Sequence, residues 1–187
     1  MMRWAFLYGV YFLSEKFMDK KRQYLPQAWQ LFNQNGFHAT GVEEIRQQLN
    51  ITKKTLYRYF SSKEQLIIEV LQYRNQVFLQ KLSEFMQNHN GHAAMLRYLD
   101  FLQDWVQQAD FYGCNFINAC AEYSHVNSAP HQIAQQHKKN IEQILASHQI
   151  EQPYLDQIFT VGEGLIVSSQ VMGYNEQVFL NLKKLFL

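Results

Sequence analysis

The apolar positions between residues 40 and 71 recur at the three- and four-residue spacing of helices that present one face to a core. They predict two short helices and the start of a third, separated by polar turn residues. The inward-facing residues are Val42, Ile45 and Leu49, then Leu56, Tyr59 and Phe60, and finally Leu66, Ile67, Val70 and Leu71. Two short helices joined by a tight turn are the layout of a helix-turn-helix, which places its second helix in the major groove of DNA.

Capping residues mark the ends of these helices. Two pairs have the spacing of a capping box, in which a hydroxyl and a carboxylate each bind a free amide: Thr40 with Glu43, and Ser61 with Glu64. The first pair predicts a helix start at Gly41 or Val42, and the second predicts the start of the third helix. Asn50 tolerates the left-handed conformation that follows a helix end, and Thr52 can cap the second helix.

The outward side of the second helix has the chemistry of a DNA-binding surface. It carries Lys53, Lys54, Thr55, Tyr57 and Arg58. Lysine and arginine neutralise phosphates, hydroxyl groups fix the register on the DNA backbone, and arginine can bind guanine in the major groove. Basic residues can also form an ordinary solvated face, but here the caps, the turn residue and the apolar positions agree on a helix-turn-helix.

A longer pattern surrounds these helices. It consists of Phe32-x3-Gly36-Phe37-x2-Thr40, then Ile45, then Ile51-Thr52-Lys53-x-Thr55-Leu56-Tyr57-Arg58-Tyr59-Phe60-x2-Lys63-Glu64-x-Leu66. Over about residues 19–70 the chain resembles the N-terminal domain of the tetracycline-repressor (TetR) family of bacterial transcription regulators. The resemblance implies that Thr40 and Lys63 contact phosphates from opposite ends of the motif and that Tyr57 lies against the DNA backbone. It also implies that residues 52–55 and Arg58 meet the groove.

Two residues depart from the family pattern. Members of the family often have glycine where this chain has Asn50, and commonly a small residue where it has Lys54. Lys54 therefore adds a cation near the groove, which can raise affinity or alter the DNA sequence that is recognised.

Composition favours an all-α fold with two domains. Among 187 residues there are only 8 glycines and 3 prolines, and no alternating strand-like segment bounded by turn residues stands out. The helix that begins at Ser61 is expected to continue to about Asn88, on the order of 40 Å, and to join the domains. We expect a helix-turn-helix DNA-binding domain at residues 18–65 and a helical ligand-binding and dimerisation domain at residues 66–187.

Net charge becomes informative once the chain is divided in this way. The whole chain carries +1 at neutral pH. Residues 18–63 hold eight basic and three acidic side chains, a net charge of +5, whereas residues 64–187 hold seven basic and twelve acidic ones, a net charge of −5. A basic DNA-binding domain attached to an acidic sensing domain would have this asymmetry.

Residues 1–17 do not follow the helix-turn-helix pattern. Their apolar run from Trp4 to Leu13 is too short for a membrane span and lacks a small-residue cleavage site. Because residues 18–22 resemble the short basic lead of TetR-family proteins, Met18 is expected to be the natural start. If residues 1–17 are present, they are expected to be an N-terminal extension that forms an amphipathic helix or lies on the surface.

The next helix is expected at about Lys20–Asn35. Gly36 would end it and Phe37 would pack back against it. Pro26 conflicts with a continuous helix because it removes one hydrogen bond. The helix is therefore expected either to begin near Leu25 or to be kinked there.

Five further helices are predicted after the turn at residues 88–91, at about residues 92–109, 114–123, 131–148, 153–172 and 175–186. The segment Gly113-Cys114-x-Phe116-x-Asn118-Ala119-x2-Glu122-Tyr123 resembles part of the C-terminal domain in one TetR subgroup. Around it we expect a pocket for a small apolar or aromatic effector, lined by Trp105, Phe111, Cys114, Phe116, Asn118 and Glu122. Packing of the same residues in an ordinary core is the alternative.

The helix expected at residues 153–172 interleaves large apolar residues with small ones. Ile158, Gly162, Leu165 and Ser169 represent this pattern, which allows another helix to approach closely. The family resemblance implies that the last two helices form a four-helix bundle with a second copy, giving a homodimer. Packing within one subunit is the alternative. A dimer matters because two helix-turn-helix motifs spaced by one DNA turn match a palindromic operator.

Other chemistry has little support in the sequence. Cys114 and Cys120 would lie on different faces of a helix, so neither a disulfide nor a zinc pair is expected. Two cysteines suit a reducing cytoplasm, and redox sensing by Cys114 stays open. No phosphate-binding loop, nucleophile elbow or paired-histidine motif is present, so no enzymatic activity, cofactor or metal site is predicted.

Two functions remain. The first is a cytoplasmic TetR-type transcriptional regulator, a repressor that a small-molecule effector releases from a palindromic operator in double-stranded DNA. The second is a helical dimeric interaction or scaffold protein without specific DNA binding. DNA binding that falls steeply with salt and still discriminates between sequences would favour the first.

Overall fold

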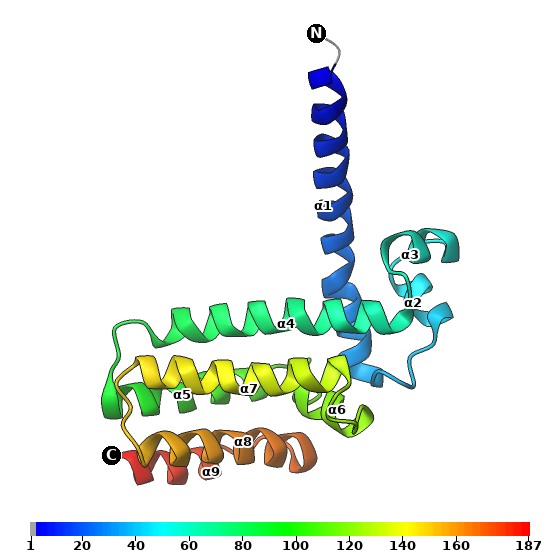
Figure 1. Ribbon diagram of the computed structural model, residues 1–187. Helices are drawn as coiled ribbons and strands as arrows, with labels where there is room; N and C mark the ends of the chain where they lie inside the picture. The colour runs from blue at the N-terminus through cyan, green and yellow to red at the C-terminus, as the bar shows by residue number, and fades with distance from the viewer. Residues whose placement is uncertain (1–2) are drawn as a thin grey trace. The chain divides into compact units, whose positions relative to one another are not determined.

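The computed structural model describes the backbone of residues 3–187 and the side chains of residues 19–187. Its helices are α1 (Arg3–Asn35), α2 (Val42–Gln48), α3 (Lys53–Tyr59), α4 (Lys63–Met86), α5 (Gly91–Val106), α6 (Asn115–Glu122), α7 (Ala129–Ser147), α8 (Tyr154–Met172), α9 (Glu176–Lys183) and the short 3-10 helix η1 (Lys184–Phe186) (Figure 1). Within the described backbone there is no strand, so the predicted all-α fold is confirmed. The hypothesis that Met18 is the natural start stays a prediction. The proposed extension, residues 1–17, lies outside the residues whose side chains are described.

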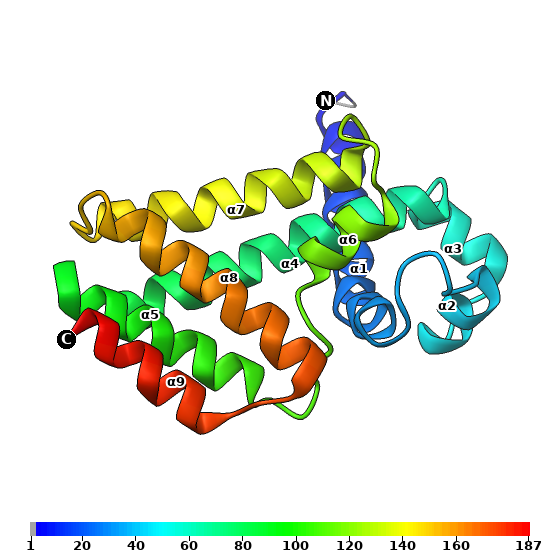
Figure 2. The same cartoon turned by 90° about the horizontal axis from the view of Figure 1, so that it is seen from below.

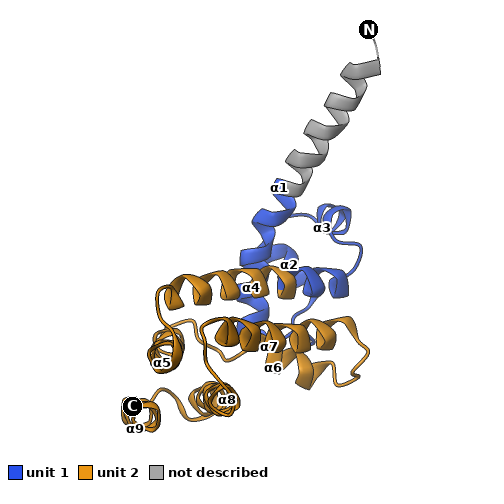
Figure 3. Cartoon of the chain, turned by 60° about the vertical axis from the view of Figure 1, so that its left-hand side comes forward, with its two compact units in different colours: residues 1–70 blue, residues 71–187 orange. Residues whose placement is uncertain are grey.

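The helices form two compact units that divide within α4. The first comprises residues 1–70 and the second residues 71–187 (Figure 3). Residues at both ends of α4 are buried, Leu66 in the first unit and Leu82 in the second. The expected domain boundary at residues 65–66 falls on the same helix and stays a prediction.

The core of the first unit is built from the apolar faces that the sequence predicts. Its buried residues include Leu25, Ala28, Phe32, Phe37, Ile45, Leu49, Leu56, Tyr59, Phe60, Leu66 and Ile67. Gly36 adopts a positive φ of 83° at the end of α1, and the Phe37 ring packs back against Phe32 with ring centroids 5.5 Å apart. Pro26 lies inside α1, so the helix does not begin near Leu25.

The cap of α2 lies one residue later than predicted. The helix begins at Val42, as expected, but its N-cap is Gly41, whose amide donates to Glu44 Oε2 (2.7 Å). The Thr40 hydroxyl donates instead to the Gly36 carbonyl (2.6 Å), and Thr40 is fully buried. Thr40 therefore closes the turn after α1, because its hydroxyl meets a free carbonyl at that helix end.

The cap of α4 is also one residue later than predicted. The Ser62 hydroxyl accepts from the Gln65 amide (3.0 Å), which makes Ser62 rather than Ser61 the capping residue. Two adjacent serines offer the same hydroxyl, and spacing alone does not distinguish them. Asn50 and Thr52 act as predicted: Asn50 has a φ of 50° in the turn, and Thr52 is the N-cap of α3.

The second unit is a bundle of helices. Within it α5 contacts α8 and α9, while α7 contacts α6 and α8 (Figure 2). The predicted helices agree with the observed ones to within a few residues at each end. The largest fully buried side chains of this unit include Leu71, Leu82, Met86, Met95, Tyr98 and Phe179.

The contact of α5 with α8 depends on a glycine. A Cβ atom at Gly162 would lie 2.7 Å from Tyr98 Cε1 and 2.9 Å from its hydroxyl oxygen, so only glycine fits without displacing the ring. Tyr98 is fully buried, and its hydroxyl has no hydrogen-bond partner in the described structure. Burial raises the pKa of this phenol well above its usual range, so Tyr98 stays neutral.

The four residues proposed from sequence for a dimer contact lie on this inner face of α8. Ile158, Gly162, Leu165 and Ser169 are all buried within the single chain. Packing within the subunit, which the sequence left as the alternative, accounts for their burial. A second copy could contact α8 only through side chains that are exposed in the single chain.

Replacing Gly162 with alanine should lower the free energy of unfolding. The new methyl group would push against the Tyr98 ring, and overpacking outweighs the helix-propensity gain, for a net loss of about 1–2 kcal/mol. Urea unfolding of Gly162→Ala measures this loss. Gly164→Ala is the matched control, because a Cβ there meets nothing within 4 Å. Equal stability of the two variants would contradict the packing of Gly162 against Tyr98.

Candidate DNA interface and effector cavity

The outer side of α3 presents the basic and hydroxyl groups that the sequence predicts. Leu56 and Tyr59 are buried and anchor the helix, whereas the other side faces solvent. Its exposed residues are Thr52, Lys53, Lys54, Tyr57 and Arg58, with Thr55 half-buried beside them. Tyr57 is 43% exposed, which is large for an aromatic ring and leaves its face accessible to a partner.

Thr52 and Thr55 hold the start of α3 together. The Thr52 hydroxyl accepts from the Thr55 amide (3.1 Å), and the two hydroxyl oxygens are 2.9 Å apart. One hydroxyl donates to the other, so one hydroxyl hydrogen is left to donate outward. The cap therefore fixes the backbone of α3 and still leaves a donor at the expected groove surface.

Arg58 lies on the ring of Tyr59. Its guanidinium carbon is 5.0 Å from the ring centroid, and Nη2 donates to the Tyr59 hydroxyl (3.1 Å). The Tyr59 ring in turn packs against Tyr24, with centroids 5.3 Å apart. The guanidinium is thus held at the surface by a buried ring, which reduces the side-chain entropy that binding would cost.

The two residues expected to contact phosphates from the ends of the motif have different surroundings. Thr40 is fully buried and its hydroxyl donates to the Gly36 carbonyl, so its side chain does not face solvent, and its contact with a phosphate stays a prediction. Lys63 is half-buried, and its ammonium donates to the His38 carbonyl (3.1 Å). Lys63 therefore connects the turn before α2 to the start of α4. A phosphate would have to bind the Lys63 ammonium alongside the His38 carbonyl.

Arg46 is a further cation in this domain, but it has a partner. Its guanidinium forms an ion pair with Glu43 one turn earlier on α2, where Nε donates to Oε2 (2.6 Å). The hydrogen bond from Arg46 lowers the pKa of Glu43 and keeps the carboxylate charged. The pair is neutral overall, so the positive charge near α3 comes from Lys53, Lys54 and Arg58.

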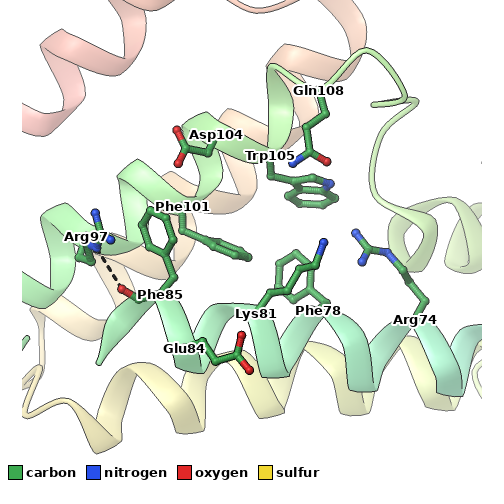
Figure 4. Close-up of a pocket in the computed structure, with 10 residues that line it drawn as sticks. All are labelled: Arg74, Phe78, Lys81, Glu84, Phe85, Arg97, Phe101, Asp104, Trp105 and Gln108. Carbon is green, nitrogen blue, oxygen red and sulfur yellow. Dashed lines mark hydrogen bonds between the residues drawn. The ribbon is translucent and has the colours of Figure 1, made fainter. Parts of the chain in front are cut away.

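The second unit contains a cavity between α4 and α5 with a volume of about 480 Å³. Figure 4 shows the side chains that line it: Arg74, Phe78, Lys81, Glu84, Phe85, Arg97, Phe101, Asp104, Trp105 and Gln108. Its size falls within the range of small-molecule sites in proteins. Of the six residues predicted to bind an effector, only Trp105 lines this cavity.

The other five predicted effector residues lie elsewhere in the same unit. Phe111 packs edge-on against the Trp105 ring, with centroids 5.4 Å apart. Cys114 and Phe116 are buried, and the Cys114 sulfur is 3.7 Å from Lys138 Nζ. The Asn118 amide oxygen accepts from Gln170 Nε2 (3.1 Å), and Glu122 is half-buried at the end of α6. These five residues do not line this cavity, and their role in effector binding stays a prediction.

Sequence reasoning missed most of the cavity because it followed aromatic residues that are close in sequence. The informative signal was helical spacing. Arg74, Phe78, Lys81 and Phe85 follow one another by three or four residues on α4, and Arg97, Phe101 and Trp105 follow one another by four on α5. Two such faces, each mixing aromatic and charged residues, meet in the structure.

Two further observations limit the chemistry of the described residues. Those residues contain no cluster of three or more histidine, cysteine, aspartate or glutamate side chains that could hold a metal ion. Among the helices that the structure describes, none is both long and apolar enough to cross a membrane.

Comparison with known proteins gives a family match for the N-terminal domain. The family model for bacterial regulatory proteins of the tetR family matches residues 25–70. The transcriptional regulator RutR of Escherichia coli K12 is 36% identical over 80 residues, which are 43% of this chain and 38% of RutR. The transcriptional repressor NemR of the same strain is 27% identical over 107 residues, which are 56% of this chain and 54% of NemR. The chain thus spans about half the length of these curated relatives or less.

Solved structures extend the likeness to the whole fold. The reduced form of Escherichia coli NemR superposes with a TM-score of 0.77 at 20% identity, covering 90% of this chain and 95% of that structure. A TetR transcriptional regulator from Chloroflexus aurantiacus gives a TM-score of 0.78 at 18% identity, covering 91% and 95%. At such low identity these similarities establish the fold of the C-terminal helices and nothing about their ligand.

The packing around Phe116 makes the stability of the protein depend on pH. Phe116 stacks on the buried ring of His137 (centroids 3.6 Å apart), whose Nδ1 donates to Asn75 Oδ1 (2.8 Å). Burial, with the nearby charges of Lys138 and Arg74, lowers the pKa of His137 from 6.5 to about 2. The imidazole is therefore neutral in the folded protein at any ordinary pH.

We expect the free energy of unfolding to fall as the pH drops below 6.5, the pKa of an unperturbed histidine. Below that pH the unfolded chain binds a proton that the folded chain excludes, whereas above it His137 is neutral in both states. The loss approaches about 1.4 kcal/mol per pH unit. Urea unfolding across this range measures it in the wild type and in His137→Leu, which should have a flatter profile. His125→Gln, at an exposed site, is the control; an unchanged slope in His137→Leu would contradict the assignment.

Proposed function

The chain belongs to the TetR family of bacterial regulatory proteins, and from this premise we propose that it represses transcription by binding a palindromic operator as a homodimer. The observation that carries the proposal is the solvent-facing surface of α3, where Lys53, Lys54, Tyr57 and Arg58 project from a helix whose opposite side is buried. A regulator of this family is not an enzyme, and its place of action would be the cytoplasm, where the DNA is.

Each residue on this surface has a proposed task. Lys53, Lys54 and Lys63 would neutralise phosphates, and Tyr57 would lie against the DNA backbone. Thr52, Thr55 and Arg58 would meet base edges or the groove wall, with Arg58 suited to guanine. Thr40 would act indirectly, since its buried hydroxyl shapes the turn before α2.

The outer side of α8 and α9 is the surface that we propose for the second copy. Exposed apolar residues lie on both helices: Val167, Val171 and Met172 on α8, and Val178 and Leu180 on either side of the buried Phe179 on α9. Val171 is 77% exposed and Met172 is 79% exposed, although both are large apolar side chains. Met172 and Val178 border the same surface hollow, which connects the exposed apolar residues of the two helices. Such faces mark interaction sites, and two copies related by a two-fold axis would cover each other.

The proposed regulation is a population shift. A small molecule bound in the second unit would favour an arrangement of the dimer in which the two α3 helices no longer match half-sites about 34 Å apart. DNA would then be released, because one helix-turn-helix contacts too few bases to bind alone. A scaffold protein without specific DNA binding is the competing proposal, and it predicts equal, weak binding to any duplex.

Lys54→Gln should reduce the salt dependence of DNA binding. Removing one phosphate contact lowers the slope of log K against log salt by about 0.9 for each α3 helix bound. Fluorescence anisotropy with a duplex from the promoter region next to the gene measures the slope, and a random duplex tests sequence preference. Lys139→Gln, an exposed lysine on α7, is the matched control. If both variants kept the wild-type slope, α3 would not be the DNA-binding helix.

Val171→Asp should convert the dimer to a monomer of 22.3 kDa without unfolding it, because a charge would enter the proposed apolar contact. Sedimentation velocity measures the mass, and circular dichroism checks the fold. Gln135→Asp introduces the same charge at an exposed site on α7 and should leave the dimer intact. A Val171→Asp protein that sediments as the wild-type dimer would exclude this interface.

A further inference from the structure

The cavity between α4 and α5 has a rigid aromatic wall. The Phe78 ring packs edge-on against Phe101 and Trp105, with centroids 5.3 Å and 5.0 Å apart. Phe85 packs edge-on against Phe101 in the same way, with centroids 5.5 Å apart. Rings locked by one another present their faces and edges without losing further freedom, which favours a flat, aromatic ligand.

A buried guanidinium lies at one end of this wall. Arg74 is only 7% exposed, and its guanidinium carbon is 5.6 Å from the Phe78 centroid and 5.8 Å from the Trp105 centroid. Burial lowers the pKa of Arg74, yet a guanidinium remains charged in proteins. Asp110 is a further charge that acts on this guanidinium, and in an apolar setting a charge attracts an anion much more strongly than it does in water.

The charged side chains of the cavity point to different parts of it. Figure 4 shows the Lys81 ammonium and the Arg74 guanidinium both directed toward the Trp105 ring, whereas the carboxylates of Glu84 and Asp104 lie toward the edges. Arg97 is held away from this end, because its Nε donates to the Phe85 carbonyl (3.0 Å) and its guanidinium lies 3.6 Å from the Phe85 centroid. Two cations therefore meet beside Trp105, at one end of the aromatic wall.

We propose that this cavity binds a small aromatic carboxylic acid in its ionised form. The ring would pack against Phe78, Phe101 and Trp105, and the carboxylate would accept hydrogen bonds from Arg74 and Lys81. A volume of about 480 Å³ accommodates one or two fused rings. An aromatic cation is disfavoured because Arg74 and Lys81 would repel its charge. The role of this acid as the effector rests on the proposed regulatory function. Its binding in the cavity does not.

Isothermal titration of the full-length protein with 2-naphthoate, in the absence of DNA, tests the site directly. 2-Naphthamide has the same ring and no charge, and cyclohexanecarboxylate has the charge and no aromatic ring. We expect naphthoate to bind at least about tenfold more tightly than either, because each control lacks one half of the recognition. Equal binding of the acid and the amide would overturn the proposal.

Two variants locate the bound acid. Arg74→Gln should weaken naphthoate binding about tenfold or more, and Lys81→Gln should weaken it severalfold without a folding risk, because Lys81 is exposed. Lys139→Gln is the control, because Lys139 is exposed on α7 and does not line the cavity. This variant should bind naphthoate as the wild type does. Unchanged affinity in Lys81→Gln together with a folded, normally binding Arg74→Gln would overturn the site.

A separate measurement distinguishes this proposal from the regulatory one. Naphthoate added to the protein bound to its promoter duplex should release the DNA if the acid acts as the effector. Binding in the titration without release from DNA would support the aromatic carboxylate site and overturn its role in regulation. If naphthoate did not bind in the titration, the proposed site would be overturned, whether or not the protein binds DNA.

Discussion

The continuity of α4 is the constraint on which the structure depends. One uninterrupted helix, Lys63–Met86, supplies buried residues to both compact units, Leu66 and Ile67 to the first and Phe78 and Leu82 to the second. The helix continues without a break through the division at Val70. Bending or unwinding of α4 on one side of Val70 would therefore disturb the backbone hydrogen bonds of the adjoining turns. The same helix begins beside the DNA-binding motif and later carries Arg74, Phe78, Lys81 and Phe85 to the cavity. A ligand that alters the position of α4 residues in the cavity acts on the element that also completes the helix-turn-helix core.

The sequence allowed the fold and the solvent-facing basic side of α3 to be predicted because both follow from local rules. Helical spacing located the buried residues of α2 and α3, and the left-handed tolerance of Asn50 marked the turn. Two of the three predicted caps were displaced by one residue, since Thr40 and Gly41, or Ser61 and Ser62, satisfy the same spacing, whereas Thr52 caps α3 as predicted. Only the three-dimensional path of the chain decides which of them meets a free amide and which, like Thr40, meets the carbonyl of Gly36.

The parts that could not be predicted are those in which two helices must be brought together. The small residues of α8 indicated a close approach, but the periodicity of one helix does not reveal whether the approaching helix belongs to the same chain. In the structure it is α5, whose Tyr98 ring covers Gly162. The cavity was missed for the same reason, because Phe78 and Trp105 are far apart in sequence and become neighbours only through the pairing of α4 with α5. The cysteine-containing segment near α6 was distinctive in sequence, yet Cys114 and Phe116 are buried against α7.

The bond between Thr52 and Thr55 has a consequence for how DNA specificity can diverge during evolution. Thr52 caps α3 and also stands at the expected groove surface, so a change there alters helix stability and base contacts together. Mutational drift at this position is confined to the few side chains that can accept a hydrogen bond from an amide, such as serine, aspartate and asparagine. Lys54, exposed in the first turn of α3, does not cap the helix and can vary at little structural cost. Under the proposed function, new operator preferences should therefore arise first at position 54 and only later, with compensation, at position 52.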